Sequence, residues 1–279
     1  MNATDQLRAL ADRIVGVYDR HVSPVAVLLA GSAARGDADF YSDLDLLMYY
    51  ERLPSRAAFE SALGELGGTI VRTGFDHEDT DYDQFFELDG VQCQLAHITT
   101  AYFESELEKI VAGERLDTPY AKVVMGLLEG RWLRGVEQIA RWREQARYRD
   151  EYQRAAIERH WKVFPLWAYE DYLRGRDAPL WRQQVLLEAA FDLLAVLAAL
   201  NRVYFTDFEV KRMRDVVGKL ELAPPNLADR LERLLLPDTS PAELESLVAE
   251  TQALLEEHLP DVELPPLRRA IGEKLEPWG

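Results

Sequence analysis

The sequence predicts an α+β protein, in which a mixed sheet flanked by helices is followed by an all-helical bundle. Short apolar runs bounded by turn residues are confined to the first hundred residues. From about Ala101 onward the apolar spacing becomes helical, and proline and glycine punctuate the chain where helices would end. We therefore expect one domain over residues 1–115 and a helical domain over residues 116–279.

The first domain is expected to open with an amphipathic helix, because apolar residues recur at helical spacing over residues 7–17. Continuous apolar runs that end at turn residues predict strands. Asp89-Gly90, between two such runs, predicts a tight hairpin. The predicted elements are a helix at 54–66 and strands at 25–30, 44–50, 69–73, 85–88 and 91–99.

The second domain is predicted to be helical throughout. The predicted helices cover residues 102–111, 121–128, 135–149, 152–174, 179–201, 208–219 and 241–258. Residues 185–200 are the most apolar stretch, but they number only 16 and include Glu188 and Asp192. That is short and charged for a membrane span, so we expect a buried central helix and no membrane partner.

Composition limits the possible functions. The 279 residues are 48% hydrophobic and 29% charged, which is typical of a globular protein. Acidic residues exceed basic ones by 49 to 32, and the net charge of −17 would oppose a polyanion. We therefore expect a small or cationic acceptor, and not a nucleic acid. The single cysteine, Cys93, and the lack of a signal peptide are typical of a cytoplasmic protein.

Residues 28–47 contain the residues best suited to catalysis. A strand ends at Gly31-Ser32, and a second strand carries Asp43 and Asp45. Because positions i and i+2 of a strand face the same side, the two carboxylates are expected to project together. Two such carboxylates can bridge magnesium ions roughly 3.5–4 Å apart for in-line phosphoryl transfer. Gly31 would let a phosphate approach closely, and the Ser32 hydroxyl and the amides after it could donate hydrogen bonds.

The pattern of Gly-Ser, ten intervening residues and Asp-hydrophobic-Asp-hydrophobic resembles the nucleotidyltransferase superfamily related to DNA polymerase beta. With Arg35-Gly36 and Ser42 it is similar to the bacterial kanamycin, streptomycin and lincosamide nucleotidyltransferases, in which a helical domain follows the catalytic one. The resemblance implies transfer of a nucleoside monophosphate from a nucleoside triphosphate, with ATP expected. The acceptor would be a hydroxyl of a small, aminoglycoside-like molecule, and pyrophosphate would be released. Relatives include monomers and homodimers, so both remain open.

The resemblance also implies a role for each matching residue. Asp43 and Asp45 would hold Mg2+, with two ions expected, and Gly31 and Ser32 would hold the triphosphate. The remaining expected nucleotide-binding residues are Arg35, Ser42, Arg202 and Lys211. Positive charge from the last two would stabilise the leaving pyrophosphate, although the alternative is favourable capping of the long apolar helix.

One position departs from the family pattern. Members usually carry a third carboxylate on a strand after a hairpin, and Gln94 occupies that place. Glutamine cannot act as a base, and its carbonyl is a weaker metal ligand. The base would then be Glu87 on the preceding strand or Glu188 in the helical domain, and the alternative for each is an ordinary exposed glutamate. Two other functions remain open: a catalytically impaired nucleotide-binding module, and a nucleotidyltransferase acting on RNA or protein.

Overall fold

The computed structural model describes residues 2–74, 79–116, 120–162, 177–207, 210, 212–236 and 241–264. Contacts divide the chain into two compact units. Unit 1 comprises Met1–Lys109 and Val123–Arg147, and unit 2 comprises Ile110–Lys122 and Tyr148–Gly279. Each unit is therefore built from two stretches of the chain.

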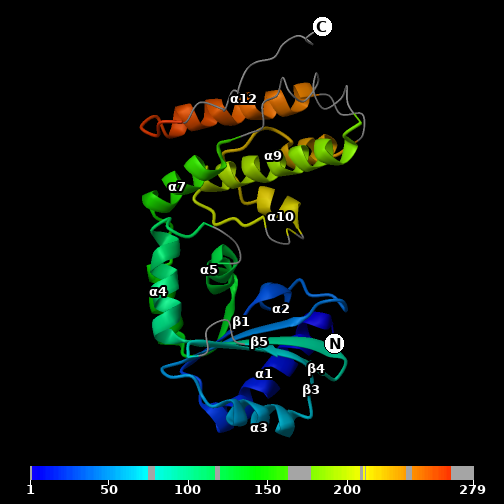
Figure 1. Cartoon of the computed structure of the whole chain (residues 1–279), viewed down its shortest axis with the longest axis vertical. Coiled ribbons are helices and arrows are strands. Elements are labelled where there is room, and N and C mark those ends of the chain that lie inside the picture. The colour runs from blue at the N-terminus through cyan, green and yellow to red at the C-terminus, as the bar shows by residue number, and fades with distance from the viewer. Residues whose placement is uncertain are drawn as a thin grey trace. The chain divides into compact units, whose positions relative to one another are not determined.

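Unit 1 is built on a six-stranded mixed sheet with the order β3-β4-β5-β2-β1-β6 (Figure 1). β2 and β5 are parallel, and the other neighbouring pairs are antiparallel. The prediction of a mixed sheet followed by helices is confirmed. The strands are β1 (Ala26–Leu29), β2 (Leu44–Tyr50), β3 (Thr69–Gly74), β4 (Asp81–Leu88), β5 (Val91–Thr99) and β6 (Arg131–Arg134).

Helices α1 (Ala3–Val22) and α3 (Arg56–Leu66) lie on one side of the sheet in Figure 1. Each begins at a polar cap. The Asn2 side chain accepts a hydrogen bond from the amide of Asp5, and the Ser55 side chain accepts one from Ala58. Alternate residues of β2, beginning with Leu44, point into the core beneath these helices. The hydrophobic face of the sheet is thereby buried.

Two further helices, α4 (Thr100–Val111) and α6 (Val136–Gln145), contribute aromatic side chains to unit 1. Phe103 and Trp142 pack on Tyr49 with ring centroids 4.9 and 4.6 Å away. Tyr49 lies near the C-terminal end of β2. At the other end of that strand Asp43 and Asp45 are only half-buried. The aromatic packing thus holds the sheet at the end away from the two acids.

A buried polar network crosses the core of unit 1. The Gln84 Oε1 atom accepts a hydrogen bond from the Tyr18 hydroxyl at 2.7 Å and lies 2.8 Å from Nε2 of His97. The Tyr50 hydroxyl lies 3.0 Å from Nδ1 of the same histidine. His97 is completely buried, and burial lowers its pKa to about 3. The neutral imidazole is therefore part of the core.

Strand β6 and helix α6 belong to unit 1, whereas the sequence-based boundary places residues after 115 in the helical domain. The sequence pattern does not predict β6. The strand has four residues and pairs antiparallel with β1, with Leu28 opposite Trp132. Gly135 follows at φ +71, and a Cβ on it would lie 2.7 Å from the Cβ of Ala26. Such a short strand has no readable alternation, so its partner β1 decides its conformation.

The described part of unit 2 is helical, as predicted. Its helices are α7 (Asp150–His160), α9 (Pro179–Leu200), α10 (Met213–Val217), α11 (Leu227–Leu234) and α12 (Pro241–His258), together with the end of α4 and the start of α5 (Tyr120–Glu129). Three predicted helices differ. The helix expected at 135–149 ends at Gln145, and the one expected at 208–219 begins at Met213. The helix expected at 152–174 ends at His160, and residues 163–174 of that range lie outside the described residues.

Helix α9 is the central helix of unit 2. It contacts α7, α11 and α12. Among the described residues, α9 alone is long and apolar enough to cross a membrane, and 67% of its most apolar 18-residue window is buried inside the protein. The core helix of a soluble protein passes the same test, and the buried central helix predicted from residues 185–200 is what the structure contains.

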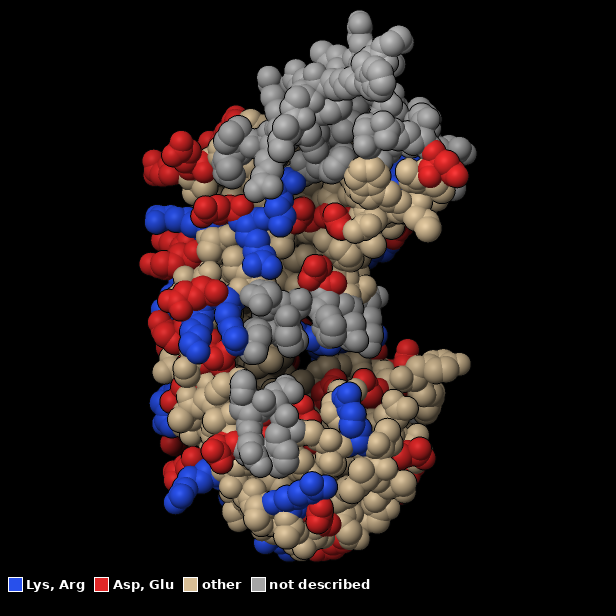
Figure 2. Space-filling model, viewed as in Figure 1, with Lys and Arg blue, Asp and Glu red and all other residues tan. Residues whose placement is uncertain are grey.

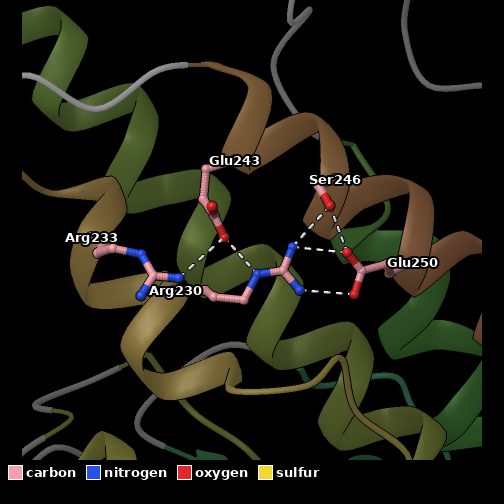
Figure 3. Close-up of polar contacts among 5 residues, drawn as sticks. All are labelled: Arg230, Arg233, Glu243, Ser246 and Glu250. Atoms are coloured by element: carbon pink, nitrogen blue, oxygen red, sulfur yellow. Dashed lines mark hydrogen bonds and ion pairs between the residues drawn. The ribbon is translucent and has the colours of Figure 1, made fainter.

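An arginine joins α11 to α12 (Figure 3). Arg230 donates hydrogen bonds to both carboxylate oxygens of Glu250 at 2.8 Å and to Glu243 at 2.5 Å. It also donates to the Ser246 hydroxyl at 3.0 Å. The Arg230 side chain is only 11% exposed. Its planar group thus connects two helices through charge-assisted hydrogen bonds.

Candidate active site

The turn after β1 brings the glycine of the Gly-Ser pair against one of the two acids. The Ala30 amide donates a hydrogen bond to the backbone oxygen of Asp45 at 3.0 Å, and the five-residue helix α2 (Gly31–Arg35) begins directly afterwards. Gly31 has φ +65, and a Cβ on it would lie 2.4 Å from Oδ2 of Asp45. Only glycine combines that conformation with so close an approach.

Asp43 directly precedes β2 and Asp45 is its second residue. Leu44 and Leu46 between and after them are buried, and both acids are half-buried. The two carboxylates therefore share the face of β2 opposite the α1 and α3 core, in keeping with their i, i+2 spacing.

The third position of the site lies on β5. Asp45 and Gln94 are direct partners in the parallel ladder, and Gln94 Nε2 donates a hydrogen bond to Oδ2 of Asp43 at 3.2 Å. Gln92 lies two residues earlier on the same face and is also an amide. Among the residues that the structure describes, no group of three His, Cys, Asp or Glu side chains is placed to hold a metal ion. The site consists of two carboxylates and an amide.

The α2 segment is held by α1 through contacts that the sequence pattern does not reveal. Arg8 donates hydrogen bonds to the backbone oxygens of Ala33 and Ala34, both at 2.9 Å. The Thr4 hydroxyl accepts one from the amide of Ala38 at 3.2 Å. These bonds satisfy backbone groups at the end of a very short helix. Arg8 thus positions the Gly-Ser turn from 25 residues away, and no local sequence signal could have found it.

The loop before Asp43 exposes two aromatic rings. Asp39 and Ser42 hydrogen-bond each other, with the Asp39 amide 3.0 Å from the serine hydroxyl and the hydroxyl 3.0 Å from Oδ1. Phe40 and Tyr41 lie between them and are 79% and 99% exposed. An adjacent aromatic pair in a polar loop is a sequence signal that could have drawn attention to these residues. Ser42, expected to bind nucleotide, is engaged in shaping this loop.

The other residues expected in unit 1 lie around this centre. Arg35 is exposed at the end of α2, with Nε 3.4 Å from Oδ2 of Asp37. Glu87 is exposed on β4, on the same sheet face as Gln94 but one strand further from Asp45. Two strand spacings separate it from β2, which is about 10 Å. Glu87 is thus near the acid pair without contacting it.

The residues expected from the helical domain belong to unit 2. Glu188 is exposed on α9 and accepts a hydrogen bond from Gln184 at 2.8 Å, so the apolar surroundings that suggested it as a base are absent there. Arg202 pairs with Asp150 and donates to the backbone oxygen of Tyr148 at 3.2 Å. Lys211 lies outside the described residues.

The carboxylate oxygens of Asp43 and Asp45 are suitable ligands for a magnesium ion that binds together with a nucleotide. Mg2+ is usually held by one or two carboxylates together with substrate phosphates, and it needs oxygen ligands. Gly31 leaves the space beside Asp45 free of a side chain. Two neighbouring carboxylates beside a glycine turn therefore fit a metal–triphosphate group.

A mixed sheet that presents two acids beside a Gly-Ser turn is an arrangement suited to nucleotide chemistry. Residues 12–117 match the nucleotidyltransferase domain family, and this range includes the Gly-Ser turn, both acids and β5. Residues 12–117 thus form a nucleotidyltransferase domain. Among solved structures, a nucleotidyltransferase-like protein from Exiguobacterium sibiricum is similar, with 11% identity, a TM-score of 0.44, and coverage of 90% of this chain and 75% of that one. No curated protein matches the chain.

Proposed function

We propose that this protein uses Mg2+ to transfer a nucleoside monophosphate from a nucleoside triphosphate, ATP being the expected one, to a hydroxyl of a small acceptor, with release of pyrophosphate. The observation that carries the proposal is the pair Asp43 and Asp45 on one sheet face, directly beside Gly31, inside the nucleotidyltransferase domain. A cytoplasmic location, and a monomer or homodimer, complete the proposal.

Each residue of the site would have a distinct task. Asp43 and Asp45 would bind the metal ion, which when present neutralises phosphate charge and polarises the reacting phosphoryl group. Gly31 and Ser32 would lie along the triphosphate, because Gly31 has no side chain to block it. Arg35, exposed next to them, would add positive charge near the leaving pyrophosphate.

Phe40 and Tyr41 are the residues we assign to substrate contact in addition to those expected from the sequence. Their rings are exposed two and three residues before Asp43, in a loop held by the Asp39–Ser42 hydrogen bonds. Exposed aromatic rings stack on planar groups such as nucleobases. A planar part of either substrate would fit this loop.

The acceptor we propose is neutral or cationic, as an aminoglycoside is. The net charge is −17, and β4 contributes Asp81, Asp83 and Glu87 to the sheet face that carries Gln94. On the molecular surface drawn in Figure 2, Lys and Arg are scattered among Asp and Glu. The negative electrostatic field of a protein with this net charge favours cations over polyanions such as RNA. Glu87 and Glu188 remain the proposed sources of a base for the acceptor hydroxyl, together with Arg202 and Lys211 as proposed triphosphate contacts.

The test is transfer from radiolabelled nucleoside triphosphates in the presence of Mg2+ to a panel of hydroxylated amines. We expect labelled product from the wild type and at least a hundredfold loss in Asp43→Asn and Asp45→Asn, since removing an electrostatic catalytic group costs about 10²–10³ in rate. Asp89→Asn is the matched control. Asp89 is an exposed acid in the β4–β5 turn that pairs with Arg13 at 2.6 Å. Equal activity in all four proteins would refute the assignment of the acids.

A second candidate function is nucleotide binding without turnover, and Gln94 is the observation that favours it. An amide at the third position cannot take a proton from an acceptor. Calorimetry with Mg2+ and ATP would distinguish the two functions. Tight binding through Asp43 and Asp45, with no pyrophosphate released by any acceptor tested, would support the second candidate.

A further inference from the structure

We infer that this chain holds one divalent cation at Asp43 and Asp45, rather than the two expected from its sequence, and that Gln94 is the reason. The inference rests on the proposed function, because the cation is the one that accompanies the nucleoside triphosphate. It concerns the number of ions and the role of Gln94, which the family of the domain does not specify.

The register of the sheet places Gln94 next to the acids. β2 and β5 form an unbroken parallel ladder in which Leu44 pairs with Cys93 and Asp45 with Gln94. Leu44 and Cys93 are both buried, so a slip of either strand by one residue would turn that strand's buried residue to the other face. Neighbouring strands lie about 4.8 Å apart, and paired residues face the same side. A third ligand from β5 would therefore have to be Gln94, or Gln92 one step along the same face.

A second ion would need negative charge that β5 does not supply. Two divalent ions in one site lie roughly 3.5–4 Å apart and repel each other strongly unless carboxylates bridge them. Asp43 and Asp45 contribute two negative charges. The β5 side chains beside them, Gln92 and Gln94, are neutral amides, and Glu87 on β4 lies two strand spacings from β2, about 10 Å. A single Mg2+ ion needs less negative charge from the protein, because one or two carboxylates and the oxygens of the substrate phosphates are enough to hold it.

Gln94 also acts as a hydrogen-bond donor to Asp43. Its Nε2 donates a hydrogen bond to Oδ2 of Asp43 at 3.2 Å, which uses a lone pair of that carboxylate. Turning the amide around would place its carbonyl oxygen against a carboxylate oxygen, and two acceptors repel each other. Gln94 thus directs hydrogens and not an oxygen toward the acid. We assign it as a positioning residue that fixes the Asp43 carboxylate.

Metal counting on the full-length protein tests this. We would titrate metal-free protein with Mn2+ in the presence of an ATP analogue whose α–β bridge is a methylene group, and count bound ions by electron paramagnetic resonance. The wild type should bind one Mn2+ per chain, and Asp45→Asn should lose it. Gln94→Glu adds a carboxylate of the same length and should bind two. Gln94→Leu should still bind one, about tenfold more weakly, because Asp43 loses its hydrogen bond.

The outcomes separate this inference from the proposed function. Two ions on the wild type, or one ion on a folded Gln94→Glu variant, would overturn the inference while leaving the proposed function intact. Unchanged affinity in Gln94→Leu would overturn the positioning role. Binding of no ion by the wild type, or binding that Asp45→Asn does not alter, would overturn the proposed function as well. Urea unfolding of each variant shows whether it is folded.

Discussion

Replacing Gly31 by alanine is expected to damage both stability and the site. At φ +65 an alanine pays a backbone cost of about 1–2 kcal/mol relative to the right-handed region. The added Cβ would lie 2.4 Å from Oδ2 of Asp45 and 3.5 Å from its Cγ. A carbon and an oxygen in contact need roughly 1 Å more, so the carboxylate must move by about that amount. Displacements of about 1 Å in a catalytic site cost on the order of 100-fold in rate.

Two measurements on the Gly31→Ala variant test this reasoning. Urea unfolding should show a loss of about 1–2 kcal/mol or more, and affinity for Mn2+ with the ATP analogue should fall at least tenfold. Gly16→Ala is the matched control, because Gly16 lies within α1 and a Cβ there meets nothing within 4 Å. That variant should gain about 0.5–1 kcal/mol and bind metal normally. A Gly31→Ala protein with unchanged stability and metal affinity would refute the close approach to Asp45.

Three further predictions concern the core, the helical unit and the exposed loop. Burial lowers the pKa of His97 from 6.5 to about 3, so between these pH values the unfolded chain binds a proton that the folded chain does not. The free energy of unfolding should therefore fall by about 1.4 kcal/mol per pH unit as the pH drops through that range. The His97→Leu variant should be less stable at pH 7 but less pH-dependent, and an unchanged pH slope in urea titrations would contradict this. The Arg230→Met variant should lose about 1–3 kcal/mol of unfolding free energy, because two glutamates lose their charged hydrogen bonds. The control Arg214→Met, at an exposed ion pair, should lose much less. Equal losses in urea unfolding would rule out a special role for the buried arginine. Replacing Phe40 and Tyr41 together by alanine should raise the KM of one substrate about tenfold without altering the unfolding free energy, and unchanged KM values for both substrates would remove these rings from the site.

Much of unit 1 follows from local sequence signals. The predicted strand at 44–50 matches β2, and the predicted hairpin around Asp89-Gly90 matches β5 and the second half of β4, because alternation and turn chemistry act over a few residues. β4 begins at Asp81, four residues before the predicted strand at 85–88. The same local rules indicate that Asp43 and Asp45 face one side. Helix lengths were less predictable. Helix α6 stops at Gln145, although helical spacing continues to residue 149. Apolar spacing alone does not determine where a helix ends.

Residues far apart in the chain required the tertiary structure. Arg8 positions α2 through two backbone oxygens, and Trp132 joins the sheet because β1 is there to pair with it. Neither residue belongs to a pattern that repeats locally. Glu188 lies in an apolar stretch of sequence, yet it is exposed, because it projects from the side of α9 away from the core. Hydropathy of neighbours along a helix does not determine which side of that helix is covered.

The sequence by itself determined the class of fold, the glycine turn and the acid pair, because strand alternation and the demands of a left-handed glycine are properties of a few consecutive residues. The family resemblance placed Gln94 at the third position of the site, and only the tertiary structure decided that it pairs with Asp45 and bonds to Asp43. The parallel pairing of β2 with β5 joins segments about fifty residues apart, and that register follows from burying Leu44 and Cys93 together. A candidate site assembled across two strands is therefore predicted in part from the sequence, and the pairing of the strands completes it.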